Sequence, residues 1–274
     1  MEAIAPLQPL EGNMSDFDRN AGARWGQSVA QAGRAEIDQG LRSFMLGVYN
    51  NMVIGLAITG LVALGANMLA VATDPSQVAA QMGKIGLTSF GVAIYGSPLK
   101  WLIIFAPLAF VLFISFRIEK VSATTARMLF FAFSAAMGLS MSTLLLVYTG
   151  TSVARAFFVT AAAFGALSLY GYTTKRDLSP IGSFLIMGLF GLIIASVVNL
   201  FVQSTAFQFG LSILSVLIFS GLTAWDTQAI KEMYYESDGY EVATKKSVNG
   251  ALRLYLDFIN IFQSLLMLTG SRNN

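Results

Sequence analysis

The sequence predicts an all-α integral membrane protein with seven transmembrane helices, the last of them central in the bundle. Of the 274 residues, 55% are hydrophobic and only 12% are charged, and the mean hydropathy is +0.65. A soluble domain carries about 25% charged residues, roughly twice this share. Long charge-free stretches also recur along the chain, and a helix needs about 20 apolar residues to cross the hydrocarbon.

The charge-free stretches give the elements in order. A polar tail, residues 1–43, precedes the membrane domain, residues 44–270. The tail carries no cleavable signal peptide pattern, and we expect it outside the membrane as solvated chain, with a short surface helix at 27–40 as the alternative. The expected spans are residues 44–71, 101–116, 128–147, 156–174, 181–201, 207–225 and 251–268.

Two segments need separate treatment. Residues 72–100 are mixed in character, and we expect their apolar middle, 85–95, to lie on the membrane surface or to pack back onto the bundle. Residues 178–225 carry no charge, but at about 1.5 Å per residue they are too long for one crossing. The polar residues between Asn199 and Gln208 divide them, either as a plain helix–loop boundary or as the lining of an outer vestibule.

The last span is unusual because it contains Arg253 and Asp257. Two charges would make it a poor helix against lipid, so we expect the other six helices to surround it. Six spans with a re-entrant last segment are the alternative, and they would move the C-terminus to the other side.

Basic residues orient the bundle, since cytoplasmic loops of membrane proteins are enriched in lysine and arginine. Most of the 17 lysine and arginine residues fall in the tail and in the connections that would share its side. The opposite side has Lys84, Lys100, Arg155 and Arg272. We therefore expect a cytoplasmic N-terminus.

Composition excludes several functions. The chain has no cysteine and no histidine, which removes disulfides, thiolate metal sites and the serine–histidine and zinc hydrolase mechanisms. The net charge of +2 is too small to indicate a nucleic-acid partner. We expect no cofactor and no enzyme activity, and the lipid bilayer as the first partner.

Asp226 and Asp257 are the candidate functional residues, because each lies at or inside a long apolar segment. A carboxylate at the bilayer centre costs about 2.5–3.5 kcal/mol even on insertion scales. The last two helices would run antiparallel, so the two carboxyl groups can meet at similar depth. Such a pair cannot ionise twice cheaply and titrates as a unit. It would form a proton-operated latch and, when ionised, a candidate Ca²⁺ site.

Simpler roles exist for these charges. Each aspartate could cap a helix or pair with an arginine, and Arg253 lies four residues before Asp257 on the same helical face. Arg117 ends the second span and could reach inward to hold the aspartates, or it could simply anchor the helix on the basic side. Arg127 and Arg253 compete with Arg117 for the holding role.

Three motifs resemble those of the Bax inhibitor family, the transmembrane Bax-inhibitor-motif proteins, in a bacterial form. They are Gly171-Tyr-Thr-Thr-Lys-Arg-Asp-Leu-Ser179, Ala224-Trp-Asp-Thr-Gln-Ala-Ile230 and Leu254-Tyr-Leu-Asp-Phe-Ile-Asn-Ile-Phe262, and the similarity covers residues 40–270 in the same order. The resemblance implies a seven-helix bundle around the last helix. It also implies that Asp226 and Asp257 match the family's pH-sensing pair, to which an arginine at the position of Arg117 bonds in the closed state.

The leading functional hypothesis is a pH-sensitive, calcium-permeable leak channel in a bacterial inner membrane, with Ca²⁺ and protons as its small partners. A regulator that binds a membrane-bound quality-control protease, through the tail and residues 231–248, is the alternative. An intramembrane aspartyl protease is disfavoured, since Leu254-Tyr-Leu stands before Asp257 in place of the glycine-x-glycine of that class.

Overall fold

The computed structural model describes the backbone of residues 16–117 and 120–273, and the side chains of residues 39–114, 116 and 120–273. The chain divides into two units, Met1–Ser43 and Phe44–Asn274. Helix α1, Asp16–Ala70, begins in the first unit and continues in the second. The backbone of the tail is helical from Asp16 onward, which is longer than the helix at 27–40 that was the alternative to solvated chain. No proline occurs between Asp16 and Ala70, so every residue of α1 can donate its backbone N–H.

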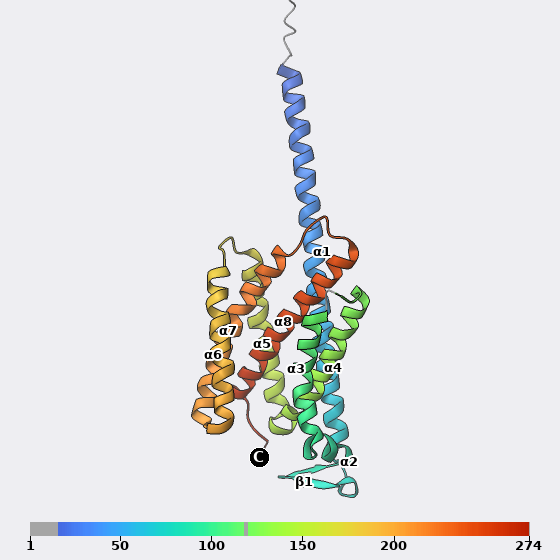
Figure 1. The fold of residues 1–274 in the computed structure, drawn as a ribbon, viewed down its shortest axis with the longest axis vertical. Helices are drawn as coiled ribbons and strands as arrows, with labels where there is room; N and C mark the ends of the chain where they lie inside the picture. The colour runs from blue at the N-terminus through green and yellow to red at the C-terminus, as the bar shows by residue number, and fades with distance from the viewer. Residues whose placement is uncertain (1–15, 118–119, 274) are drawn as a thin grey trace, which may run out of the picture. The chain divides into compact units, whose positions relative to one another are not determined.

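The second unit is almost entirely helical (Figure 1). Serine and threonine side chains start several of its helices by accepting a hydrogen bond from a backbone N–H of the first turn, as Ser122, Thr149 and Ser204 do. The helices are α2 (Ser89–Gly91), α3 (Leu99–Arg117), α4 (Ala123–Val147), α5 (Gly150–Thr173), α6 (Ser179–Val202), α7 (Thr205–Glu232) and α8 (Tyr240–Thr269).

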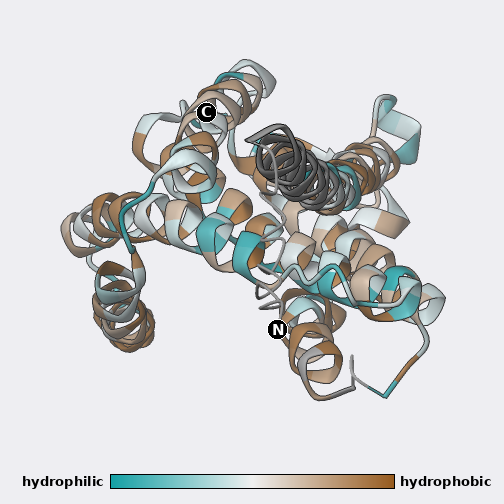
Figure 2. Cartoon of the chain, turned by 90° about the horizontal axis from the view of Figure 1, so that it is seen from above, coloured by the Kyte–Doolittle hydropathy of each residue, from teal (hydrophilic) through white to brown (hydrophobic). Residues whose placement is uncertain are grey.

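Six helices in the described part are long and apolar enough to cross a membrane. The pair Ser89–Gly96 and Leu99–Ile114, which is bent by 61°, adds a seventh span when it is counted as one. Hydrophobic residues predominate along the helices in Figure 2, and most of the large exposed side chains are apolar. The predicted all-α integral membrane fold is therefore confirmed.

Helix α8 is the most buried of the spans. In its most apolar window 61% of residues are buried, against 11–39% in the other five. It packs against α7, α5 and α4, and α1 reaches it through two side-chain hydrogen bonds. Asn51 donates to Ser247 Oγ at 3.3 Å, and Thr59 and Tyr255 share a hydrogen bond of 2.6 Å. The last helix is central, as the sequence predicts.

Residues 72–100 pack back onto the bundle. A small antiparallel hairpin pairs β1, Ala80–Met82, with β2, Ile85–Leu87. Leu87, Ile94 and Tyr95 are buried in a cluster with Ala70 and Leu146, the ends of α1 and α4. The second of the two alternatives for this segment is thus the observed one.

The chain ends in a short bonded segment, residues 270–273, which we call the C-terminal clasp. Its partners are the end of α4 and the start of α5. Thr149 N donates to Ser271 O at 3.0 Å, and Asn273 N donates to Val147 O at 2.9 Å. The clasp places the end of α8 beside the α4–α5 connection, at the end of the bundle away from the α7–α8 connection (Figure 1).

Helices α7 and α8 extend well beyond the charge-free windows. Helix α7 continues past Asp226 to Glu232, and α8 begins at Tyr240 instead of near residue 251. The charges in these extensions find partners inside the protein: Lys231 Nζ donates to Tyr172 O at 3.0 Å and Lys246 Nζ to Met233 O at 3.0 Å. Both aspartates consequently lie inside helices, and Asp257 is far from the start of α8.

Candidate functional site

Asp226 and Asp257 face each other across the contact between α7 and α8. Asp226 is 7% exposed and Asp257 is 3% exposed. Their carboxyl groups are close enough to interact directly, both by charge and by hydrogen bonding. The structure therefore brings together the two residues that the sequence singles out, at similar depth in two antiparallel helices.

Arg253 is the cation of this site. Its Nη1 lies 3.5 Å from Asp226 Oδ1, and its charge also acts on Asp257. The side chain is about one-third exposed, and its guanidinium lies over the Trp225 ring at 5.7 Å. Among the described residues, Arg253 pairs with α7 across the helix contact and not with Asp257 on its own helix.

The other two candidate arginines are placed differently. Arg117 is the last residue of α3, and its side chain lies outside the described residues, so its predicted bond to the aspartates stays a prediction. Arg127 lies in the second turn of α4, and its buried Nε has no hydrogen-bond partner among the described residues.

One oxygen of each carboxyl group lacks a hydrogen bond within the described part of the chain. These buried atoms are Asp226 Oδ1 and Asp257 Oδ2. Asp226 Oδ1 is the oxygen that Arg253 Nη1 faces at 3.5 Å, so Asp257 Oδ2 is the one that also lacks an ion pair among the described residues. An unpaired buried acceptor costs about 1–3 kcal/mol, so Asp257 has unused capacity for a proton or a cation. No group of three or more acidic side chains that could hold a metal occurs among the described residues. Calcium usually takes six to eight oxygens, so two carboxylates would supply only part of its shell.

A close helix contact fixes the depth of Asp226. At Gly171 in α5, a Cβ atom would lie 2.1 Å from the backbone oxygen of Ala224 in α7. Only glycine allows the two backbones to approach this closely. Nearby, Ser168 Oγ connects Tyr49 OH at 2.7 Å with Thr227 Oγ1 at 3.0 Å, which links α1, α5 and α7.

The connection between α5 and α6 is fastened to α7 by Gln228. Its Oε1 accepts from Leu178 N at 2.8 Å, and its Nε2 donates to Arg176 O at 2.8 Å. In the same connection, hydrogen bonds from Ser179 lower the pKa of the exposed Asp177 carboxyl. Asp177 therefore stays ionised near neutral pH.

Sequence reasoning missed Gln228 and the hydrogen-bonded chain through Ser168. Gln228 stands two residues after Asp226 in the quoted motif, and an amide beside a functional carboxylate was a usable signal. The chain through Ser168 left no signal, because its members come from three helices far apart in sequence.

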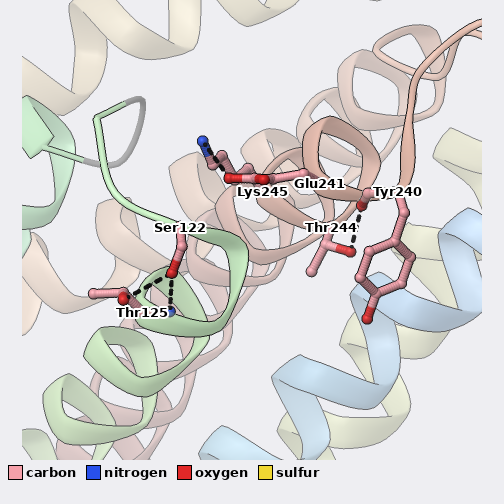
Figure 3. Close-up of polar contacts among 6 residues, drawn as sticks. All are labelled: Ser122, Thr125, Tyr240, Glu241, Thr244 and Lys245. Atoms are coloured by element: carbon pink, nitrogen blue, oxygen red, sulfur yellow. Dashed lines mark hydrogen bonds and ion pairs between the residues drawn. The ribbon is translucent and has the colours of Figure 1, made fainter.

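The connection between α7 and α8 is exposed. Tyr235 and Tyr240 are largely exposed there. Figure 3 shows the first turns of α8, where Thr244 Oγ1 donates to Tyr240 O at 2.7 Å and Lys245 pairs with Glu241 at 3.3 Å. These bonds keep the start of α8 helical beyond the apolar window.

Comparison of the sequence with known proteins places the chain in a family. A family model described as "Inhibitor of apoptosis-promoting Bax1" matches residues 41–274. The chain is 44% identical over 237 residues to the Rickettsia prowazekii protein RP147, covering 86% of this chain and 93% of that protein. It is 42% identical over 236 residues to the Escherichia coli inner membrane protein YbhL, covering 85% and 93%. A Caulobacter vibrioides protein is 44% identical over 260 residues, covering 94% and 98%. The chain belongs to the Bax inhibitor family.

Proposed function

We propose that this protein is a pH-sensitive, calcium-permeable leak channel whose sensor and gate is the pair Asp226 and Asp257. One observation carries the proposal: two buried carboxyl groups touch within a membrane bundle, and Arg253 balances them at 3.5 Å from Asp226. Buried acidic residues in transmembrane helices usually mark ion or proton pathways. Calcium is the transported ion in this scheme and not a resident cofactor.

The gate responds to the protonation of the two carboxyl groups. When both carboxyl groups are ionised, they attract Arg253 and, by the family resemblance, Arg117. As pH falls, the pair takes up protons, and its attraction for these arginines weakens. The contact between α7 and α8 loses its electrostatic restraint, which changes the resistance of the pathway. Of the polar groups on the surrounding helices, Tyr49 on α1 reaches Thr227 on α7 through Ser168.

Calcium influx into liposomes tests the proposal. Purified wild type, Asp226→Asn and Asp257→Asn are compared in a pH series from about pH 6 to pH 8, because a coupled pair titrates as a unit in two steps. We expect a pH-dependent flux in wild type whose pH dependence disappears in both variants. Asp177→Asn is the matched control, because Asp177 is ionised throughout this range and its asparagine can still accept the bond from Ser179 N. Absence of flux from folded wild type at every pH would refute the leak.

A regulator that binds a membrane-bound protease is the second candidate. The exposed tyrosines Tyr235 and Tyr240 favour it, since tyrosine is enriched in protein interfaces. Deleting residues 1–43 separates the two functions. The leak in purified liposomes should survive the deletion, whereas copurification of a protease from cell membranes should be lost.

For its location we propose the bacterial inner membrane, with a cytoplasmic N-terminus. The relative YbhL is named an inner membrane protein, and the distribution of basic residues supports the orientation. With seven spans, the C-terminal clasp then lies on the outer side.

A further inference from the structure

A groove between α6, α7 and α8 has both polar and apolar side chains in its lining. Its volume is about 370 Å³. Gln208, near the start of α7, and Met267, near the end of α8, mark its mouth, so it begins at the C-terminal end of the bundle. Its polar lining includes Gln208, Ser212, Ser215, Asn260, Gln263 and Ser264.

Some of these polar groups lack protein partners. Ser264 Oγ donates to Ser215 Oγ at 2.7 Å, and Asn260 Nδ2 donates to Leu256 O at 2.8 Å. The Gln263 amide, however, bonds to no group among the described residues. It lies six residues before the end of α8, which is about 9 Å along the helix. Gln263 is only partly buried, and an unpaired amide costs about 4–8 kcal/mol in a hydrocarbon-like medium, which favours water as its partner.

The groove has room for this water. A single molecule needs about 10–15 Å³ of such volume, a small part of the groove. At the inner end lie Phe219 and Asn260. Asn260 is three residues from Asp257 on the same face of α8, and Leu222, which is buried, lies one turn before Asp226 on α7. We call Phe219 and Leu222 the apolar plug, because both are buried and lie between Ser215 of the groove lining and Asp226 along α7.

We infer that the groove is a water-filled inlet, which brings water and small hydrated cations from the C-terminal end of the bundle to within one helical turn of Asp257. The apolar plug closes its inner end. The role in cation entry rests on the proposed leak, whereas the filling with water does not.

The natural absence of cysteine allows a direct test. Single variants Gln263→Cys and Ser212→Cys are reconstituted into liposomes and treated with a membrane-impermeant cationic methanethiosulfonate on both sides. Leu214→Cys is the matched control, because Leu214 is 45% exposed, lies two residues from Ser212 on α7 and does not line the groove. A thiol must ionise in water to react, so we expect both inlet variants to react at least about tenfold faster than the control.

The outcomes separate this inference from the leak. Slow reaction of both inlet variants, equal to that of the control, overturns the inlet whatever the calcium flux. Fast reaction in a protein that passes no calcium supports the water-filled inlet and removes only its role in cation entry. Ser212→Cys is nearly isosteric, so its result stands even where Gln263→Cys perturbs the fold.

Discussion

Arg253 carries two interactions that a lysine could not reproduce together. Its planar guanidinium contacts Asp226 at 3.5 Å while it lies over the Trp225 ring at 5.7 Å. Arginine stacks on aromatic faces and stays charged in almost any environment, whereas lysine is a compact, strongly hydrated point charge. The indole therefore shields one face of the ion pair and leaves the other open to solvent.

Replacing Arg253 by glutamine should destabilise the protein. Removing one member of a buried pair costs about 3–5 kcal/mol, and an exposed pair is worth about 0–1 kcal/mol. Because Arg253 is one-third exposed, we expect a loss of about 1–3 kcal/mol, measured by thermal unfolding in detergent. The double variant with Asp226→Asn should recover part of the loss, since no uncompensated charge then remains at that position. Simple additivity of the two losses would contradict the pairing.

Replacing Gly171 by alanine should also destabilise the protein. A Cβ at this position meets the Ala224 oxygen at 2.1 Å, so Gly171→Ala must push α5 from α7. Overpacking costs about 1–3 kcal/mol. Gly165→Ala on the same helix meets nothing within 4 Å, and it should be neutral or should stabilise by up to about 1 kcal/mol. Thermal unfolding of the two variants side by side measures the difference, and equal stabilities would show that the helices separate freely.

Sequence reasoning at the residue scale found the carboxyl groups and named three candidate cations, Arg117, Arg127 and Arg253, without deciding among them. A buried aspartate stands out in an apolar stretch because the free-energy cost of burying a carboxylate can be recognised before its neighbours in the fold are known. Which arginine pairs with which aspartate depends on helix rotation: the spacing pointed to Asp257 as the partner of Arg253, whereas Arg253 pairs with Asp226 on α7. The contact of Gly171 was invisible for the same reason, since a glycine is informative only once its facing helix is known.

Among the elements, α7 and α8 show why helix ends were harder to predict than helix centres. Charge-free windows stop at the first charged residue, yet Lys231 and Lys246 lie within helices and bond to backbone oxygens of other segments. A charged residue marks the end of a span that faces lipid, whereas a helix that contacts protein can continue past it. Cores of the spans were thus predictable, whereas their ends depend on tertiary partners.

The apolar plug on α7 makes an element-scale prediction for the leak. Leu222→Ala removes buried volume between the inlet and Asp226, so water should cross the plug more easily. We expect calcium influx at least about threefold above wild type, with its pH dependence retained because the aspartates are intact. Leu214→Ala, on the same helix but facing away from the groove, is the control. An unchanged flux in Leu222→Ala would place the barrier elsewhere.

For the whole molecule, the position of the C-terminal clasp fixes the relation between the two ends of α8. The clasp lies beside the α4–α5 connection, away from the α7–α8 connection. With a cytoplasmic N-terminus, alkaline phosphatase fused after Asn274 should be active, and green fluorescent protein fused there should stay dark. The opposite pattern would mean that the last segment re-enters, or that the orientation inferred from the basic residues is wrong.

The arrangement of the bundle was largely predictable because lipid imposes simple rules. Hydrophobic length gave the number of spans, and the two charges of the last span gave its central place. The hairpin at residues 80–87 and the clasp were not foreseen, since both consist of short segments whose backbone bonds depend on packing. Their location at one end of the bundle became apparent only in three dimensions.

The burial of α8 has a consequence for how the protein is made. It follows the other five spans in the sequence and is the least hydropathic of the six, at 1.3 against 1.6–2.5 for the others. The earlier spans must therefore enter the bilayer before the helix that they surround, and α8 must then pack against these spans instead of lipid. Biogenesis should then stall in a chain truncated before residue 240, and the intermediate should be a client for membrane chaperones and proteases.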